Sequence, residues 1–163
     1  MLRPATDADR ADVLRWRNHP EVRAASLSQQ EITEAEHETY WAATRDGDAR
    51  EIYIYERYGE PSGVVTYFNI DREAATAWWG YYLDNDGLRQ RGEMLPAWME
   101  IQREAKRLAF DELGLTTLEG EVLEVNEAVR RFNRRNGFKE VERYTHDIDG
   151  TPTPVLRVRA TKG

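Results

Sequence analysis

The residue types that could do chemistry are concentrated between positions 78 and 138. The loop that precedes Pro96 carries Arg89, Arg91 and Gly92, and Pro96 suits the first turn of a helix. The start of a helix presents free backbone N–H groups, and the helix dipole favours an anion there. A glycine beside it allows another molecule to approach the backbone closely. This pattern is compatible with an ordinary loop glycine before a helix or with a site for a phosphate-bearing ligand.

A second basic cluster lies on a predicted short helix at 127–136, which carries the arginines Arg130, Arg131, Arg134 and Arg135. Such a cluster is compatible with a solvated helix face or with contact to the phosphates of a ligand. The chain has a net charge of −7, which repels a polyanion in bulk. A phosphate-bearing ligand therefore needs a local basic patch of this kind.

Three side chains are candidates for moving a proton. Tyr81 and Tyr82 are neighbours on an aromatic segment, and either could line a pocket, order a water or pack in the core. His37 titrates near neutrality, so it could accept a proton or bind a substrate, or it has no role in chemistry. The three histidines of the chain are too scattered for metal-ligand spacing.

Four elements position these groups in the order strand, helix, strand, helix: 76–84, 96–113, 118–125 and 127–136. The first strand is interrupted by Gly80, an isolated glycine of the kind that marks a β-bulge or a close backbone approach. Gly114 is expected to cap the long helix, and Asn126 begins the short one. A bulge at Gly80 predicts that the two strands splay apart.

The remaining elements are predicted as strands 2–5, 51–58, 64–70, 139–146 and 153–159, with helices at 6–18 and 33–45. This order predicts an α/β (α+β) fold. Its central sheet is mixed and mostly antiparallel, has about seven strands and carries helices on both faces. Because no linker or repeat divides the chain, residues 1–163 are predicted to form one domain.

Bulk composition excludes several classes of function. The net charge of −7 argues against a nucleic-acid partner or an anionic membrane surface. The chain has no cysteine, which excludes a disulfide scaffold, a thiolate nucleophile and a cysteine-based zinc site. No apolar run of membrane-spanning length and no signal-peptide core is present, so a cytoplasmic location is expected.

The segment N-E-A-V-R-R-F-N-R-R-N-G-F at 126–138 resembles the Asn-x-Ala-(x)8-Gly-Phe signature of the GNAT superfamily of acetyl-CoA-dependent N-acetyltransferases. The loop R-Q-R-G-E-M at 89–94 lies where that family carries its pyrophosphate-binding loop. The segments W-R-N-H-P-E-V-R at 16–23 and E-x-x-H-x-x-x-W at 34–41 are similar to the branch that acetylates amino-sugar nucleotides and ribosomal-protein N-termini. The resemblance covers essentially the whole chain.

The resemblance implies that acetyl-CoA binds where the strands 76–84 and 118–125 splay apart, with the pantetheine chain pairing with strand backbone. The cofactor-binding residues that it implies are Leu83, Asp84, Arg89, Arg91, Gly92, Glu93, Met94, Leu95, Asn126, Arg130 and Asn133. The catalytic candidates are Tyr81, Tyr82, Asn126 and His37. Acceptor contacts are expected from Trp16, Arg17, Asn18 and His37.

Two residues depart from the family pattern. Met94 is bulky where a small residue would let backbone meet phosphate, and Glu93 adds an anion beside it. Asn133 stands where many members have a tyrosine that protonates the departing thiolate. An amide can donate a hydrogen bond but is not an acid at neutral pH.

The sequence therefore predicts a monomeric or homodimeric enzyme that transfers an acetyl group directly from acetyl-CoA to a small-molecule amine, such as an amino sugar or a nucleotide-linked amino sugar. Two alternatives stay open. One is a protein or peptide α-amine acetyltransferase, for which Glu31, Glu34 and Glu36 are possible contacts. The other is a non-catalytic acyl-CoA-binding module.

Overall fold

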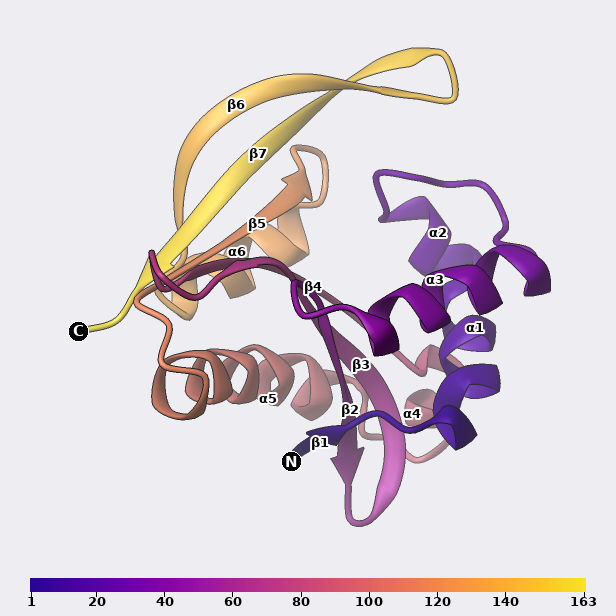
Figure 1. The fold of residues 1–163 in the computed structure, drawn as a ribbon. Helices are drawn as coiled ribbons and strands as arrows, with labels where there is room; N and C mark the ends of the chain where they lie inside the picture. The colour runs from indigo at the N-terminus through magenta and orange to yellow at the C-terminus, as the bar shows by residue number, and fades with distance from the viewer.

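The computed structural model describes residues 1–163 and contains one sheet with helices packed around it (Figure 1). The strands are β1 (Leu2–Pro4), β2 (Glu51–Arg57), β3 (Glu60–Asp71), β4 (Thr76–Leu83), β5 (Thr117–Leu123), β6 (Lys139–Ile148) and β7 (Thr151–Thr161). The helices are η1 (Asp7–Asp9), α1 (Arg10–Arg17), α2 (Pro20–Ala24), α3 (Glu34–Asp46), α4 (Asn85–Gln90), α5 (Met94–Arg107), η2 (Leu108–Glu112) and α6 (Glu127–Arg135). No helix has both the length and the apolar character needed to cross a membrane.

The sheet has the order β1-β2-β3-β4-β5-β7-β6, and all its pairs are antiparallel except β4 with β5. The single parallel pair is the one that α5 connects, because a parallel connection needs a crossover. The predicted mixed, mostly antiparallel sheet of seven strands is confirmed.

Helices cover both faces of the sheet because apolar side chains alternate along its central strands. Tyr53 and Tyr55 of β2 point into the large core beneath α5, where Ile101 is fully buried. Ile54 between them points to the opposite face and packs with Trp16 of α1 in the second core. In Figure 1, α1, α2 and α3 accordingly lie on one side of the sheet and α5 and α6 on the other.

The splay between β4 and β5 is present, but its cause differs from the predicted one. The two strands pair only from Thr76 with Thr117 to Trp78 with Glu119. No bulge occurs at Gly80, which stays in continuous register with β3. β4 is thus held by β3 along its whole length and β5 by β7, so the sheet opens between two separately paired halves.

The segment 85–93, predicted as a loop, contains the short helix α4. Asp84 caps this helix, and its Oδ1 accepts a hydrogen bond of 3.1 Å from the Gly87 amide. Asp and Gly are also common in turns, so Asp86 followed by Gly87 favoured a loop in the prediction. The long helix begins at Met94, two residues before Pro96, and the strand predicted to reach Val125 ends at Leu123.

Candidate active site

A cavity of about 540 Å³ lies at the gap between β4 and β5. Residues from several elements line it: Arg17, Glu21, Val22, Ala25, Ser26, Leu27, Ser28, Tyr40, Arg50, Thr66, Phe68, Trp79, Gly80, Tyr81, Tyr82, Leu83, Asn85, Trp98, Gly120, Glu121, Val122, Asn126, Val129, Asn133 and Val158. Of the residues that the sequence indicated, the structure brings Tyr81, Tyr82, Leu83, Asn126, Asn133 and Arg17 together here.

The cavity passes through the sheet. Tyr81 and Val122 reach it from the face that α5 and α6 cover. Tyr82, which packs with the core beneath α1 and α3, reaches it from the other face. We call these two regions the α5 side and the α1 side of the cavity. Two ligands approaching from opposite faces could therefore meet between β4 and β5.

A buried amide joins two of the candidate residues on the α5 side. Gln102 of α5 is fully buried, and its Nε2 donates to the Tyr81 hydroxyl at 3.1 Å and to Asn133 Oδ1 at 2.9 Å. Its Oε1 accepts from Asn136 Nδ2 at 2.8 Å, which fixes which end of the amide faces Tyr81. The Tyr81 oxygen accepts from Gln102, so its own proton remains to donate into the cavity. Burial raises the pKa of Tyr81, which keeps that proton on the hydroxyl.

Asn126 combines a structural position with a place on the cavity wall. It is the N-cap of α6, and its Oδ1 accepts from the Val129 amide at 3.4 Å. Its side chain contacts the cavity close to the point where β5 ends. The cap uses the amide oxygen, so the Nδ2 group remains available as a donor.

The loop before α5 has the backbone geometry expected of an anion site. Gly92 has a φ of +68°, in the left-handed region that favours glycine, and a Cβ built there would meet nothing within 4 Å. The amides of Met94 and Leu95 begin α5, where N–H groups have no partner within the helix. The Met94 side chain packs against the main core, whereas Leu95 is 62% exposed.

The charged side chains of this loop have partners within the protein. Arg89 forms a bidentate pair with Glu21 of α2, with both N–O distances at 2.5 Å, and Arg91 donates to Ser62 Oγ at 3.0 Å. The Glu93 carboxylate accepts from Arg57 Nε at 2.9 Å. This pair with a mostly buried guanidinium neutralises the anion that the sequence placed beside the loop.

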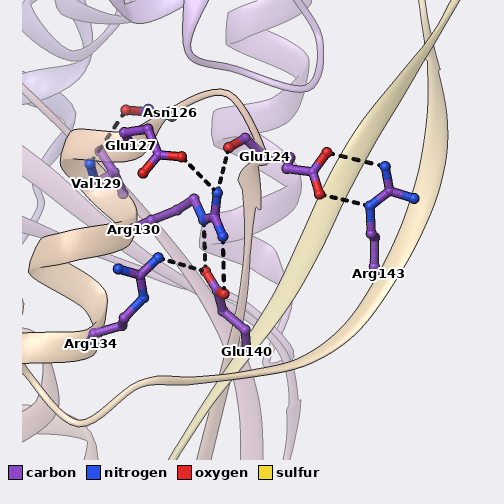
Figure 2. A network of polar contacts seen from close by, with 8 residues as sticks. All are labelled: Glu124, Asn126, Glu127, Val129, Arg130, Arg134, Glu140 and Arg143. Carbon is purple, nitrogen blue, oxygen red and sulfur yellow. Dashed lines mark hydrogen bonds and ion pairs between the residues drawn. The ribbon is translucent and has the colours of Figure 1, made fainter.

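Arg130 lies in an ion-pair network outside the cavity (Figure 2). Its guanidinium binds both carboxylate oxygens of Glu140, at 2.8 and 3.2 Å, and also reaches Glu127 and the Glu124 carbonyl. This pairing holds the pKa of the Glu140 carboxyl below its usual range. The network ties α6 to β6, which gives Arg130 a structural task that the sequence did not indicate.

The α1 side of the cavity carries two arginines that form no ion pair with a carboxylate. Arg17 Nη2 donates to the Ser28 carbonyl at 2.7 Å, while its Nη1 is buried without a partner. Burial lowers the pKa of Arg17. The Arg50 guanidinium lies 4.7 Å from the ring centroid of Tyr40. Both guanidinium groups could receive an anionic group of a ligand.

Three residues predicted for the acceptor site lie outside the cavity. Trp16 is 3% exposed in the core beneath α1. Asn18 holds the backbone of Ile32, donating to its carbonyl and accepting from its amide, both at 2.8 Å. His37 is 3% exposed, stacks against Tyr40 and leaves both ring nitrogens unpartnered. α1 and α3 bury Trp16 and His37, whereas Asn18 follows α1 and holds the loop at Ile32.

Other cavity residues escaped the sequence analysis. Tyr40, Trp98, Arg50 and Glu121 line the cavity but are not among the predicted site residues. The regular alternation along the strand that contains Glu121 places it opposite Val122, on the α1 side. That alternation was the one sequence signal that could have selected it.

Comparisons with known proteins agree with this fold. The family model described as an acetyltransferase (GNAT) domain matches residues 1–139. The crystal structure of a spermidine N-acetyltransferase from Vibrio cholerae in complex with CoA and spermine is similar, with a TM-score of 0.86 and 15% identity over 99% of this chain and 94% of that chain. A candidate phosphinothricin N-acetyltransferase has a TM-score of 0.79 and 18% identity over 99% of this chain and 97% of that one. No curated protein matches the sequence significantly.

Proposed function

Because this chain belongs to the GNAT acetyltransferase family, whose members transfer an acetyl group from acetyl-CoA to an amine, we propose that its acceptor is a small amine that also carries an anionic group. A nucleotide-linked or phosphorylated amino sugar is the class that fits. The observation that carries this proposal is the cavity that passes through the sheet, with unpaired arginines on its α1 side.

The α5 side of the cavity fits the cofactor. Beyond Trp78 the backbone of β4 has no partner on β5, so Leu83 and its neighbours offer free backbone groups for an extended pantetheine chain. The amides of Met94 and Leu95, beside the open backbone of Gly92, would hold the pyrophosphate. When bound there, acetyl-CoA supplies an activated acetyl thioester.

The protein's own groups supply the remaining chemistry on the α5 side. Tyr81, oriented by Gln102, holds a proton that it can donate to a departing thiolate. Asn133 accepts from the same Gln102 amide and so maintains the position of that donor. The Nδ2 group of Asn126 can donate a hydrogen bond to an acyl oxygen in the cavity.

The α1 side favours an anionic acceptor. Arg17 and Arg50 line it without an ion-pair partner, whereas Glu21, on the same side, is already neutralised by Arg89. A bidentate guanidinium suits a phosphate or a carboxylate. An acceptor with an anionic group would pair with one or both arginines while its amine points to the gap between β4 and β5.

The peptide alternative loses its support from the acidic residues of α3. Glu34 binds Arg10 at 2.5 Å, Glu36 completes the capping box with Thr33, and neither lines the cavity. A polyamine, the ligand class of the Vibrio cholerae enzyme, would require free carboxylates on the α1 side. There Glu121 is the one carboxylate without an ion pair to arginine or lysine.

The test is a thiol-release assay with acetyl-CoA over four acceptors: a free amino sugar, the same sugar linked to a nucleotide diphosphate, spermidine and a short peptide with a free α-amine. We expect the nucleotide-linked sugar to give the highest kcat/KM, and Arg50→Gln to raise its KM with less effect on the free sugar. A preference for spermidine or the peptide would reject the anionic acceptor, and no turnover with any amine would reject the enzyme activity.

A further inference from the structure

Gly80 leaves a place without a side chain at the edge of the gap. It lies on β4 two residues beyond Trp78, which is the last β4 residue paired with β5. It lines the cavity, and Thr66 of β3 stands opposite it in the register. Because Trp79 points into the core beneath α5, its neighbour Gly80 faces the α1 side. The missing side chain is therefore on the side that the proposed acceptor occupies.

The fold does not require a glycine at this position. Gly80 has no positive φ, it stays in register with β3, and a Cβ built on it would meet nothing within 4 Å. In the middle of a strand, glycine is destabilising, because it loses more conformational freedom on folding than any other residue. A β-branched residue such as valine would therefore suit the strand better.

Gly80 differs in this respect from all the other glycines. Of the 11 glycines in the chain, it is the one that combines an ordinary φ with an unobstructed Cβ position. Gly120, which lines the cavity from β5, shows the contrast, because a Cβ there would lie 3.2 Å from Trp79 Nε1. A strand glycine marks a bulge or a close approach by backbone or ligand. With no bulge and no protein atom near Gly80, the approach of a ligand is the remaining reason.

The walls around this open position suit a ring. Tyr82, two residues along β4, and Phe68 of β3 line the cavity on the same face as Gly80. Tyr40 of α3 lines it from the helix layer, with the Arg50 guanidinium beside its ring. A strand surface without a side chain is a flat floor, which fits the face of a ring. Aromatic walls pack against the carbon–hydrogen face of a sugar, whereas a flexible linear amine needs no such floor.

We propose that Gly80 selects a cyclic acceptor. The sugar ring lies against the strand backbone at Gly80, with its amine at the gap and its anionic group towards Arg17 and Arg50. This inference rests on the proposed function and deepens it, because it distinguishes a cyclic amine from a linear amine of the same charge. Gly80 is a specificity-determining residue and not a catalytic one, since it contributes space and no functional group.

The first experiment compares Gly80→Val with the wild type on two acceptors, an amino-sugar phosphate and a linear aminoalkyl phosphate of the same charge. A small change in the shape of a pocket discriminates by about tenfold or more, so kcat/KM for the sugar should fall by at least that factor, whereas the value for the linear amine should change less than about threefold. Gly80→Ala should give an intermediate loss for the sugar. An equal loss for both acceptors, no loss for the sugar, or a wild-type preference for the linear amine would overturn the proposal.

The second experiment needs no turnover. Since the backbone and the open space put no strain on a side chain, Gly80→Val should raise the melting temperature by about 1–4 °C. The matched control is Gly120→Val, a strand glycine of the same cavity whose new side chain would crowd the buried Trp79, so its melting temperature should fall. A lower melting temperature in Gly80→Val would show that the fold itself requires the glycine, which contradicts the proposal.

The third experiment measures binding by calorimetry. The amino-sugar phosphate, titrated into the CoA complex, should bind Gly80→Val about tenfold or more weakly than the wild type, while CoA binds both proteins equally. Loss of CoA affinity in the variant would place Gly80 in the cofactor site and reject the ring site. If the wild type acetylates no amine, the proposed function fails and the ring site fails with it. If the wild type acetylates the sugar phosphate and Gly80→Val does so equally well, the ring site alone fails.

Discussion

At the scale of single residues, one amide sets the arrangement of the α5 side of the cavity. Gln102 donates one hydrogen to Tyr81 and the other to Asn133. The two acceptor atoms thus lie on either side of a single nitrogen, although they come from β4 and α6. We therefore propose that the Tyr81 hydroxyl, rather than a side chain at position 133, protonates the departing thiolate.

We expect Tyr81→Phe to lower kcat at least tenfold, a barrier increase of roughly 1.4 kcal/mol, without loss of CoA affinity. Adding Asn133→Tyr should restore much of that turnover, and Asn133→Tyr alone should leave turnover unaltered or raise it. Turnover of the two variants and of their combination is measured with saturating acetyl-CoA. A large drop for Asn133→Tyr alone, with intact cofactor binding, would show that the amide has a positioning role of its own.

Variants of Asn126 can distinguish its role as a helix cap from a role in catalysis. Asp caps a helix as well as Asn, so Asn126→Asp should leave the melting temperature nearly unchanged. The substitution removes the Nδ2 donor and brings a negative charge to the cavity wall, so turnover should fall at least tenfold, or roughly 1.4 kcal/mol in the barrier. Asn126→Ala is the companion variant, because it loses the cap as well and should cost about 1 kcal/mol of stability. Near-normal turnover in Asn126→Asp would leave Asn126 as a helix cap only.

At the scale of elements, the connection from β4 to α5, where we propose the pyrophosphate to bind, neutralises its own acidic side chain. Arg57 of β2 holds the Glu93 carboxylate, with Arg91 3.6 Å away on its other side. The backbone of Gly92 and the first amides of α5 then face outward without a competing free anion. Helix α4, which the sequence did not predict, sets the distance between the gap and this site.

Gly92→Asp should weaken CoA binding severely, because it places a carboxylate at the start of α5 where the pyrophosphate would lie. The backbone is left-handed there, so any side chain costs about 1 kcal/mol, and Asn and Asp tolerate this conformation best. Gly92→Asn therefore has the same backbone cost without the charge and is the matched control. Calorimetric titration with CoA should give a much weaker Kd for Asp than for Asn. Equal affinities in the two variants would remove this loop from the cofactor site.

At the scale of the whole molecule, the sheet consists of two halves that are joined by the short pairing of β4 with β5. The main core beneath α5 extends under both halves, because it includes Val122 of β5 and Leu156 of β7, whereas the core beneath α1 and α3 belongs to the half formed by β1 to β4. In the other half, β6 and β7 project as a long hairpin in Figure 1, and a small separate core lies around Leu123 and Val155. Global stability should therefore depend strongly on the packing of α1 and α3, where His37 is buried.

His37 should make the stability of the protein depend on pH near neutrality. Burial, with a smaller contribution from Arg10, lowers the pKa of His37, so the unfolded chain binds its proton at a higher pH than the folded one. Stability is complete above the unfolded pKa of about 6.5 and is lost as the pH falls from there towards the folded pKa. His37→Leu should flatten the melting temperature between about pH 7 and pH 5. Parallel curves for wild type and variant would show that His37 is not buried as a neutral group.

The sequence by itself determined the features that depend on neighbouring residues. The sequence predicted a strand at 51–58, where β2 lies, and marked Asn126 as the start of the helix that is α6. The 126–138 segment indicated the family, and six of the site residues predicted from that resemblance line the cavity. Each of these signals is carried by residues close together in the chain, within reach of one turn or one strand.

The tertiary structure decided which side chains share a space. Arg130 and Glu140 form a salt bridge because α6 packs beside β6. Glu121 meets His146 across β7, and that contact follows from the strand order β5-β7-β6, which no local pattern specifies. Trp16 and His37 were expected in the acceptor site, but α1 and α3 bury them, and Asn18 instead binds the backbone of Ile32. A periodic pattern gives the faces of an element but not the element that will cover each face.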